Sequence, residues 1–135
     1  MFDLTGRIAV VTGASAGLGR GEAIALARQG ADVAIIARRA EKLDEVAAEI
    51  RGLGRRCLPV VCDVTEPGQI ESAIGQVIAE YGKVDILVNN TGGGPSAPLE
   101  DISDEMFMYH VQLELMATFR FTRGFGKYML ERGYG

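Results

Sequence analysis

The stretch from Val10 to Gly19 constrains this chain more than any other, because three glycines follow directly on a run of branched apolar residues. The apolar run, 7–12, is typical of a strand buried on both faces, and an alanine-rich helical pattern begins at Gly17. Glycines allow a sharp turn and let a ligand approach the peptide N–H groups closely. The start of the following helix adds unpaired N–H donors and the positive end of the helix dipole, so we expect a pyrophosphate to bind here.

The rest of the chain repeats this alternation of strand and helix. We expect further strands over 32–37, 56–62 and 84–89, and helices over 17–29, 40–51, 67–81 and, with interruptions, 104–132. Strands that alternate with helices of this length predict βαβ units and a parallel sheet with helices on both faces. The predicted fold class is therefore α/β: a doubly wound, Rossmann-like sheet with about four strands, in one domain covering 1–135.

Composition and cysteine spacing narrow the classes of partner. The formal net charge is −4 without a basic cluster, so nucleic acid is not an expected partner. No apolar run approaches the ~20 residues that span a bilayer, and no signal-peptide pattern opens the chain, so we expect a cytoplasmic protein without a membrane partner. Cys57 and Cys62 have an odd separation on one predicted strand, which places them on opposite faces as buried thiols, and we expect no metal site.

The end of the second predicted strand bears on the choice of ligand. In an open α/β sheet, ligands bind beyond the carboxyl ends of the strands, near the switch in strand order. At this position an acid would select NAD, whereas an arginine would accept the 2′-phosphate of NADP. Ala37 and Arg38 stand there without a carboxylate, and the arginine fork matches phosphate oxygens, which favours NADP. The alternative is that Arg38 and Arg39 form the solvated start of the next helix.

Two more strand ends carry polar residues suited to a dinucleotide. Asp63 follows the third strand and could accept a hydrogen bond from an adenine amino group; the alternative is an Asx turn or a cap for the helix over 67–81. Asn89 and Asn90 end the fourth strand and could be simple turn residues. However, the glycine-rich segment that follows them would let a cofactor backbone pass closely.

Three segments in order along the chain resemble the motifs of the short-chain dehydrogenase/reductase family: Thr12-Gly13-Ala14-Ser15-Ala16-Gly17-Leu18-Gly19, Cys62-Asp63-Val64 and Asn89-Asn90-Thr91-Gly92. The resemblance covers the whole chain and is greatest to the 3-oxoacyl-(acyl-carrier-protein) reductase-like members. It implies an NADP-dependent oxidoreductase that reduces a ketone to an alcohol, with NAD a less favoured cofactor. The resemblance also implies which residues hold the dinucleotide: Gly13, Ser15, Ala16 and Leu18, in the turn with Gly17 and Gly19, at the pyrophosphate and ribose; Arg38 at the 2′-phosphate; Asp63 and Val64 at the adenine; and Asn90, Thr91 and Gly92 beside the nicotinamide-side ribose.

The chain departs from the family pattern at three places. Thr91 stands where the family usually has alanine. Aligning Phe107 and Met129 with the family's usual tryptophan and methionine puts Glu114 where an asparagine helps to hold a water in the proton relay. The family's catalytic serine and Tyr-x-x-x-Lys pair have no counterpart. Four positions after Tyr81, Tyr109 and Tyr128 stand Asp85, Leu113 and Arg132, none of them a lysine, and Tyr134 is too near the end of the chain to begin such a pair.

These departures limit the expected activity. Reduction of a ketone needs an acid that protonates the developing alkoxide, and we expect no catalytic residue in this chain. His110, the one histidine, is expected to be packed or solvated. We therefore expect the cofactor-binding half of an oxidoreductase, incomplete at its C-terminal end, with a small-molecule or acyl-carrier-linked carbonyl substrate only in a complete chain. The alternative is a natural short protein that binds a nucleotide or a partner without catalysis.

Two expectations concern stability and assembly. A fourth strand at the edge of the sheet would be open to pairing, so the chain alone should be marginally stable. The family often pairs through its long helices, so a homo-oligomer is one possibility, and the sequence leaves the oligomeric state open. The apolar positions in the last helix are consistent with a core or a subunit face: Met106, Phe107, Val111, Leu115 and Phe119.

Overall fold

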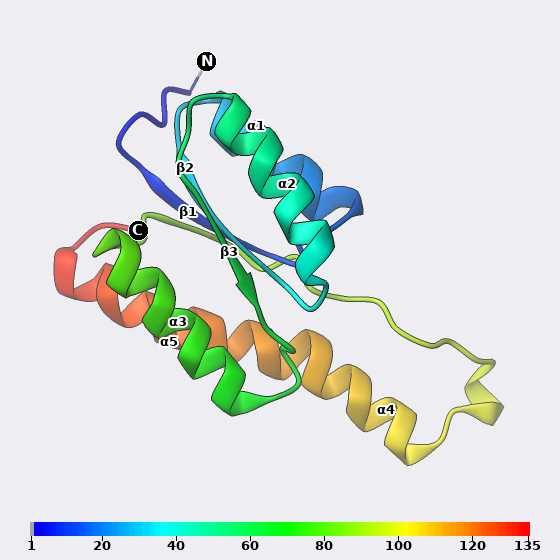
Figure 1. The fold of residues 1–135 in the computed structure, drawn as a ribbon. Coiled ribbons are helices and arrows are strands. Elements are labelled where there is room, and N and C mark those ends of the chain that lie inside the picture. The colour runs from blue at the N-terminus through cyan, green and yellow to red at the C-terminus, as the bar shows by residue number, and fades with distance from the viewer. Residues whose placement is uncertain (1) are drawn as a thin grey trace.

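Parallel strands in the order β3-β2-β1-β4 form the centre of the computed structural model, which describes residues 2–135 (Figure 1). The first strand pairs on one side with β2, with Ile8 opposite Asp32, and on the other with β4, with Ala9 opposite Ile86. The elements in chain order are β1 (Ile8–Thr12), α1 (Gly17–Arg28), β2 (Asp32–Ala37), α2 (Ala40–Gly52), β3 (Cys57–Val61), α3 (Pro67–Tyr81), β4 (Ile86–Val88), a 3-10 helix (Leu99–Asp101), α4 (Asp104–His110), a π-helical segment (Val111–Met116) and α5 (Ala117–Arg132).

The predicted fold class is confirmed, and most predicted elements lie within a residue of their observed bounds. Helix α3 begins with Pro67, whose missing N–H is harmless in a first turn, and Gly82 ends it in the left-handed conformation. β4 is shorter than the predicted 84–89. At its start, the Asp85 carboxylate takes the Ile8 N–H at 2.8 Å, and at its end the Asn90 N–H donates to the Thr12 hydroxyl at 3.0 Å. At the start the Asp85 N–H still donates to Ile8 O at 2.8 Å, so a side chain replaces one of the two backbone bonds there, and side chains make the bonds at the end.

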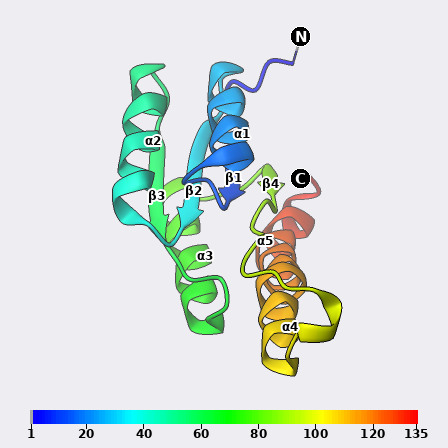
Figure 2. The same ribbon diagram turned by 90° about the vertical axis from the view of Figure 1, so that its right-hand side faces the viewer.

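Helices cover both faces of the sheet and make two separate cores (Figures 1 and 2). Successive residues of β1 point to opposite faces: Ala9 and Val11 pack with α1 and α2, and Val10 packs with α3 and α5. All five β1 residues are buried, which explains their continuous apolar pattern. The largest fully buried side chains, Phe121 and Phe125, lie in the second core.

The last helix buries a different set of residues from the predicted one. Leu113, Ala117, Phe121 and Phe125 face the core, four positions apart. Phe107, Leu115 and Phe119 are exposed by 61%, 65% and 50%, so they do not belong to the core, and the other interpretation, a subunit face, stays a prediction. The physical reason is the π-helical segment, whose wider turn shifts the phase of the helix.

The two cysteines lie as predicted. Cys57 belongs to the core under α1 and α2, whereas Cys62 belongs to the core under α3 and α5. Both thiols are free and buried, and burial raises the pKa of Cys57 to about 12 and that of Cys62 to about 11. They are therefore unreactive core residues.

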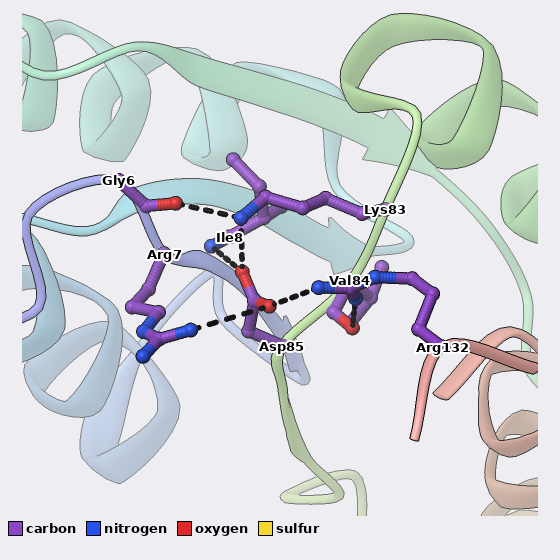
Figure 3. A network of polar contacts seen from close by, with 7 residues as sticks. All are labelled: Gly6, Arg7, Ile8, Lys83, Val84, Asp85 and Arg132. Carbon is purple, nitrogen blue, oxygen red and sulfur yellow. Dashed lines mark hydrogen bonds and ion pairs between the residues drawn. The ribbon is translucent and has the colours of Figure 1, made fainter. Parts of the chain in front are cut away.

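At the amino end of the sheet, a buried carboxylate holds the first strand, β4 and the end of α5 together (Figure 3). Asp85 is 3% exposed; its Oδ2 accepts the Ile8 N–H at 2.8 Å and lies 3.0 Å from Lys83 Nζ. Its Oδ1 accepts a hydrogen bond from Arg132 Nη2 at 2.8 Å and lies 3.9 Å from Arg7 Nη1. Burial alone would raise the pKa of Asp85, but the hydrogen bonds outweigh it and hold the pKa below its ordinary value. We call these residues the Asp85 cluster.

Candidate functional site

A cavity of about 330 Å³ lies at the carboxyl end of the sheet, where the turn after β1 meets the ends of the other strands. Its volume is at the lower end of the range for small-molecule sites. The lining residues come from every strand end and from the last helix: Gly13, Ser15, Ala16, Ala37, Arg38, Arg39, Cys62, Val64, Asn90, Thr91, Gly92, Gly93, Gly94, Tyr109 and Leu113.

The glycines of the turn are required by backbone conformation and by space. Gly13 has φ +65°, and a Cβ there would lie 3.0 Å from Asn90 Nδ2. Gly19 has no unusual φ, but a Cβ on it would overlap the Asn90 side chain and lie 2.5 Å from Gly13 O. Any side chain at either position would push the turn away from the end of β4.

The start of α1 offers unpaired donors beside this cavity, which Ser15 and Ala16 line. Gly17, Leu18 and Gly19, also predicted as cofactor ligands, are not among its lining residues. Ala16 precedes the helix without a side-chain cap, and the first turn contains no acidic residue. The N–H groups of Gly17, Leu18 and Gly19 therefore have no acceptor within the helix. The Leu18 side chain is 80% exposed, so it is the backbone of this turn that can hold an anion.

Thr12 and Asn90 fasten the turn to the end of β4. The Thr12 hydroxyl accepts hydrogen bonds from the N–H groups of Asn90 at 3.0 Å and Thr91 at 3.2 Å. Asn90 Nδ2 donates to Thr12 O at 3.2 Å and to Gly13 O at 3.3 Å. The neighbouring Asn89 instead donates to the Thr122 hydroxyl on α5, so the two asparagines have different roles.

One polar atom of this region has no hydrogen-bond partner among the described residues. Thr91 Oγ1 is buried and makes no hydrogen bond to any of residues 2–135, although Thr91 lines the cavity. A buried hydroxyl without a partner is unfavourable unless a ligand or water completes it. This atom therefore points to a polar group in the cavity.

Two arginines line the cavity after β2. Arg38 and Arg39 are exposed, and Arg39 Nη2 donates to Ser15 Oγ at 3.2 Å across the cavity. Sequence reasoning named Arg38 as the phosphate ligand and missed the position of Arg39 opposite the turn. The adjacent arginines in the sequence could have indicated that Arg39 also lies at the site.

The structure contains the turn that was the alternative interpretation of Asp63. Its Oδ1 accepts hydrogen bonds from the Thr65 N–H at 3.0 Å and the Thr65 hydroxyl at 2.7 Å. Those bonds, with the Arg38 charge acting in the same direction, hold the pKa of Asp63 below its ordinary value. Asp63 does not line the cavity among the described residues, whereas the adjacent Val64 does. A contact of Asp63 with adenine remains a prediction.

The β4 side of the cavity contains the glycine-rich segment expected there and, in addition, Tyr109 and Leu113, which sequence reasoning did not assign to a site. Gly93 and Gly94 lie in the segment after β4, and Tyr109 and Leu113 project from the last helix with helical spacing. His110 is packed, as one of the two expected outcomes, and its Nε2 lies 2.8 Å from Pro95 O. The spacing of Tyr109 and Leu113 was visible in the sequence, but the direction in which this helix face points was not.

The described part of the chain gives no sign of metal or membrane chemistry. Residues 2–135 contain no group of three histidine, cysteine or acidic side chains placed to hold a metal ion. Within the same residues, no helix has the length and apolar character needed to cross a bilayer.

The sheet order gives the cavity two sides around the turn after β1. The turn after β1 occupies the middle, because β2 and β3 lie on one side of β1 and β4 on the other. Arg38 and Val64 line the β2–β3 side, and Gly92 and Tyr109 line the β4 side. An elongated ligand with an anionic centre and two arms would meet donors along its whole length.

Known proteins share both the sequence pattern and the structure. A family model described as short chain dehydrogenase matches residues 7–135. D-threitol dehydrogenase of Mycolicibacterium smegmatis is 37% identical over 134 residues, which cover 99% of this chain and 52% of that protein. This chain thus spans about half the length of the curated relatives that it matches over its full extent.

Two solved structures are similar over nearly the whole chain. L-sorbose reductase from Gluconobacter frateurii, complexed with NADPH and L-sorbose, is 34% identical with a TM-score of 0.93, covering 98% of this chain and 51% of that chain. An NAD+-bound xylitol dehydrogenase is 28% identical with a TM-score of 0.92, again covering 98% of this chain and 51% of that one.

Proposed function

The chain belongs to the short-chain dehydrogenase family, and from that premise we propose that it binds NADP(H) in an oxidoreductase that interconverts a ketone and an alcohol. The observation that carries the proposal is the composition of the cavity. Ser15 and Ala16, which directly precede the unpaired N–H donors of α1, line it between Arg38 and Arg39 on one side and the glycines 92–94 on the other. This arrangement suits a pyrophosphate flanked by two nucleosides.

The described residues fit such a cofactor. The backbone from Gly13 to Gly19 would hold the pyrophosphate, and Arg38 would hold the 2′-phosphate, with Arg39 beside it. Val64 would pack on the adenine, and Asp63 would accept a hydrogen bond from the adenine amino group. Asn90, Thr91 and Gly92 would lie along the nicotinamide-side ribose, where the unpartnered Thr91 hydroxyl gains a partner. When bound, the cofactor supplies the hydride.

The preference for NADP over NAD rests on this chain's own residues, since similar structures carry either cofactor. The 2′-phosphate needs cations near the end of β2, and a carboxylate there would repel it. Arg38 and Arg39 follow Ala37 at this place and line the cavity. We propose a 3-oxoacyl-like ketone as the carbonyl substrate, on the strength of the sequence motifs.

We further propose that the 135-residue chain binds the cofactor without turnover. None of its tyrosines begins a Tyr-x-x-x-Lys pair, and Tyr109, which lines the cavity, is followed by Leu113 at that spacing. Without a lysine to lower its pKa, a tyrosine is a poor acid at neutral pH. This observation also favours the second candidate function, a protein that binds the dinucleotide without catalysis.

Calorimetric titration of the purified chain with NADPH and with NADH measures the two affinities and tests the proposal. We expect tighter binding of NADPH, and we expect Arg38→Asp to reverse the order. Arg28→Asp, which makes the same charge change at the far end of α1, serves as the control and should keep the preference for NADPH. Equal affinities for the two cofactors in the unmodified chain would contradict the assignment of NADP, and turnover of NADPH with a ketone would contradict the lack of catalysis.

A further inference from the structure

The segment between Thr91 and Pro98 has very little to hold it in place. It runs away from the sheet before the chain returns as α4 (Figure 1), and residues 92–96 are exposed. Gly92, Gly93 and Gly94 nevertheless form part of the cavity wall. Within the described chain, one hydrogen bond holds residues 92–97 to the rest of the molecule: that between Pro95 O and His110 Nε2, at 2.8 Å.

The His110 ring also packs directly on this segment. Gly94 has φ +127°, and a Cβ on it would lie 3.0 Å from His110 Cε1 and 3.2 Å from Tyr109 Cε1. Glycine thus lets two adjacent rings of α4 approach the backbone. The two rings meet edge to face, with their centroids 5.8 Å apart.

The hydrogen-bonding partners of His110 indicate which ring nitrogen carries a proton. A carbonyl oxygen only accepts, so Nε2 carries the proton and donates to Pro95 O. On the other side of the ring, Nδ1 lies 3.4 Å from Glu114 Oε1, one helical turn further on. The Pro95 carbonyl therefore fixes the ring through Nε2, and Nδ1 can donate to the Glu114 carboxylate only when the ring carries both protons.

We propose that His110 is a positioning residue that fixes the Gly92–Pro95 segment as the wall of the cofactor site on its β4 side. The inference rests on the proposed function, since a fixed wall matters only if a dinucleotide binds here. The sheet order places this wall across the turn from Arg38. His110 should therefore affect the nicotinamide half of the cofactor and leave the adenosine half, which binds near Arg38, unaffected.

The test compares NADPH with adenosine 2′,5′-bisphosphate, which contains the adenosine and 2′-phosphate but lacks the nicotinamide half. The variants are His110→Gln and His110→Asn. Both are polar, but the glutamine amide can reach the position of Nε2, whereas the shorter asparagine amide reaches only that of Nδ1. His110→Leu removes the donor altogether, and Met108→Leu on the exposed face of α4 controls for general effects on the helix.

We expect His110→Asn and His110→Leu to weaken NADPH binding by about fivefold to tenfold, the effect of one hydrogen bond. His110→Gln should restore most of this loss, and Met108→Leu should cause none. Binding of adenosine 2′,5′-bisphosphate should be the same in all variants. Equal NADPH affinities for the glutamine and asparagine variants would overturn the role of His110, as would a parallel loss for both ligands. Failure of the unmodified chain to bind either ligand would instead contradict the proposed function itself.

Discussion

The two ends of the sheet treat polar groups in opposite ways. At the amino end, both oxygens of the buried Asp85 are occupied by hydrogen bonds and ion pairs (Figure 3). At the carboxyl end, the first N–H groups of α1 have no intrahelical acceptor and the buried Thr91 hydroxyl has no partner in the described chain. The same two strands, β1 and β4, connect the ends. The polar groups are thus hydrogen-bonded within the protein at the end where chain segments are joined, and they lack protein partners at the end where a ligand can bind them.

This contrast separates residues for stability from residues for binding. The Asp85 cluster joins segments distant in the sequence: Arg7 precedes β1, Asp85 precedes β4, and Arg132 ends α5. Thr12 and Asn90 join β1 to β4 at the other end but leave the turn beside them accessible. Substitutions at the two ends should therefore change different quantities, and each of the following predictions tests that separation.

The largest expected effect is on stability, at the amino end. Asp85→Asn leaves the partly exposed Arg7, Lys83 and Arg132 around an uncharged side chain, and each charge-assisted hydrogen bond lost in this way costs about 1.5–3 kcal/mol. The free energy of unfolding in urea measures the loss. Asp44→Asn on the exposed face of α2 is the control and should change it by less than about 0.5 kcal/mol. The NADPH affinity of the folded Asp85→Asn chain should stay near that of the unmodified chain. A large loss of affinity would contradict the separation of stability from binding between the two ends of the sheet.

The same comparison has a defined dependence on pH. The pKa of Asp85 is lower in the folded chain than in the unfolded one, so the unfolded chain binds the proton first as the pH falls. The stabilisation is present at neutral pH and is lost progressively below about pH 5. The difference in stability between the unmodified chain and Asp85→Asn should shrink in that range; a difference that grows there would contradict the ion-pair explanation.

At the carboxyl end, Gly19→Ala should affect binding most. Its Cβ would overlap the Asn90 side chain and approach Gly13 O, so the turn must move away from β4. We expect NADPH affinity to fall by about tenfold to a hundredfold, as overpacking by one methyl group displaces the backbone donors. Gly21→Ala in the same helix is the matched control, because no atom lies within 4 Å of its Cβ and alanine favours a helix.

The smallest effect is expected for Thr91→Ala. An unpartnered hydroxyl adds nothing to the stability of the free protein, so its removal should leave the free energy of unfolding unchanged or slightly raised. NADPH affinity should fall by a few-fold, about 0.5–1.5 kcal/mol. Thr12→Val provides the contrast: it strips the N–H groups of Asn90 and Thr91 of their acceptor, and stability should decrease by about 1–3 kcal/mol.

The fold was largely predictable from the sequence because its signals are local. Buried parallel strands appear as short apolar runs, and Pro67 and Gly82 mark the ends of α3. The errors arise where distant residues meet. β4 is shorter than its apolar run because Asp85 and Asn90 bond across to β1, and neither bond is visible in the sequence around them.

The candidate site was predictable to the extent that it lies at strand ends. The turn after β1, Arg38, Val64 and Asn90 follow directly on strands and were named on that basis. Tyr109 and His110 were not, because their placement depends on how α4 returns over the segment after β4. The buried face of the last helix was also not predictable, because the π-helical segment shifted the buried positions to Leu113 and Phe121.

The most direct measurement of the contrast between the two ends is an NMR titration of the isotope-labelled chain with NADPH. The account predicts the largest shifts for the backbone amides of Gly17, Leu18 and Gly19 and for the segment after Asn90. The amides of Ile8 and Asp85 should keep their positions throughout. Shifts concentrated at the Asp85 cluster, or none at the start of α1, would contradict the assignment of the carboxyl end as the cofactor site.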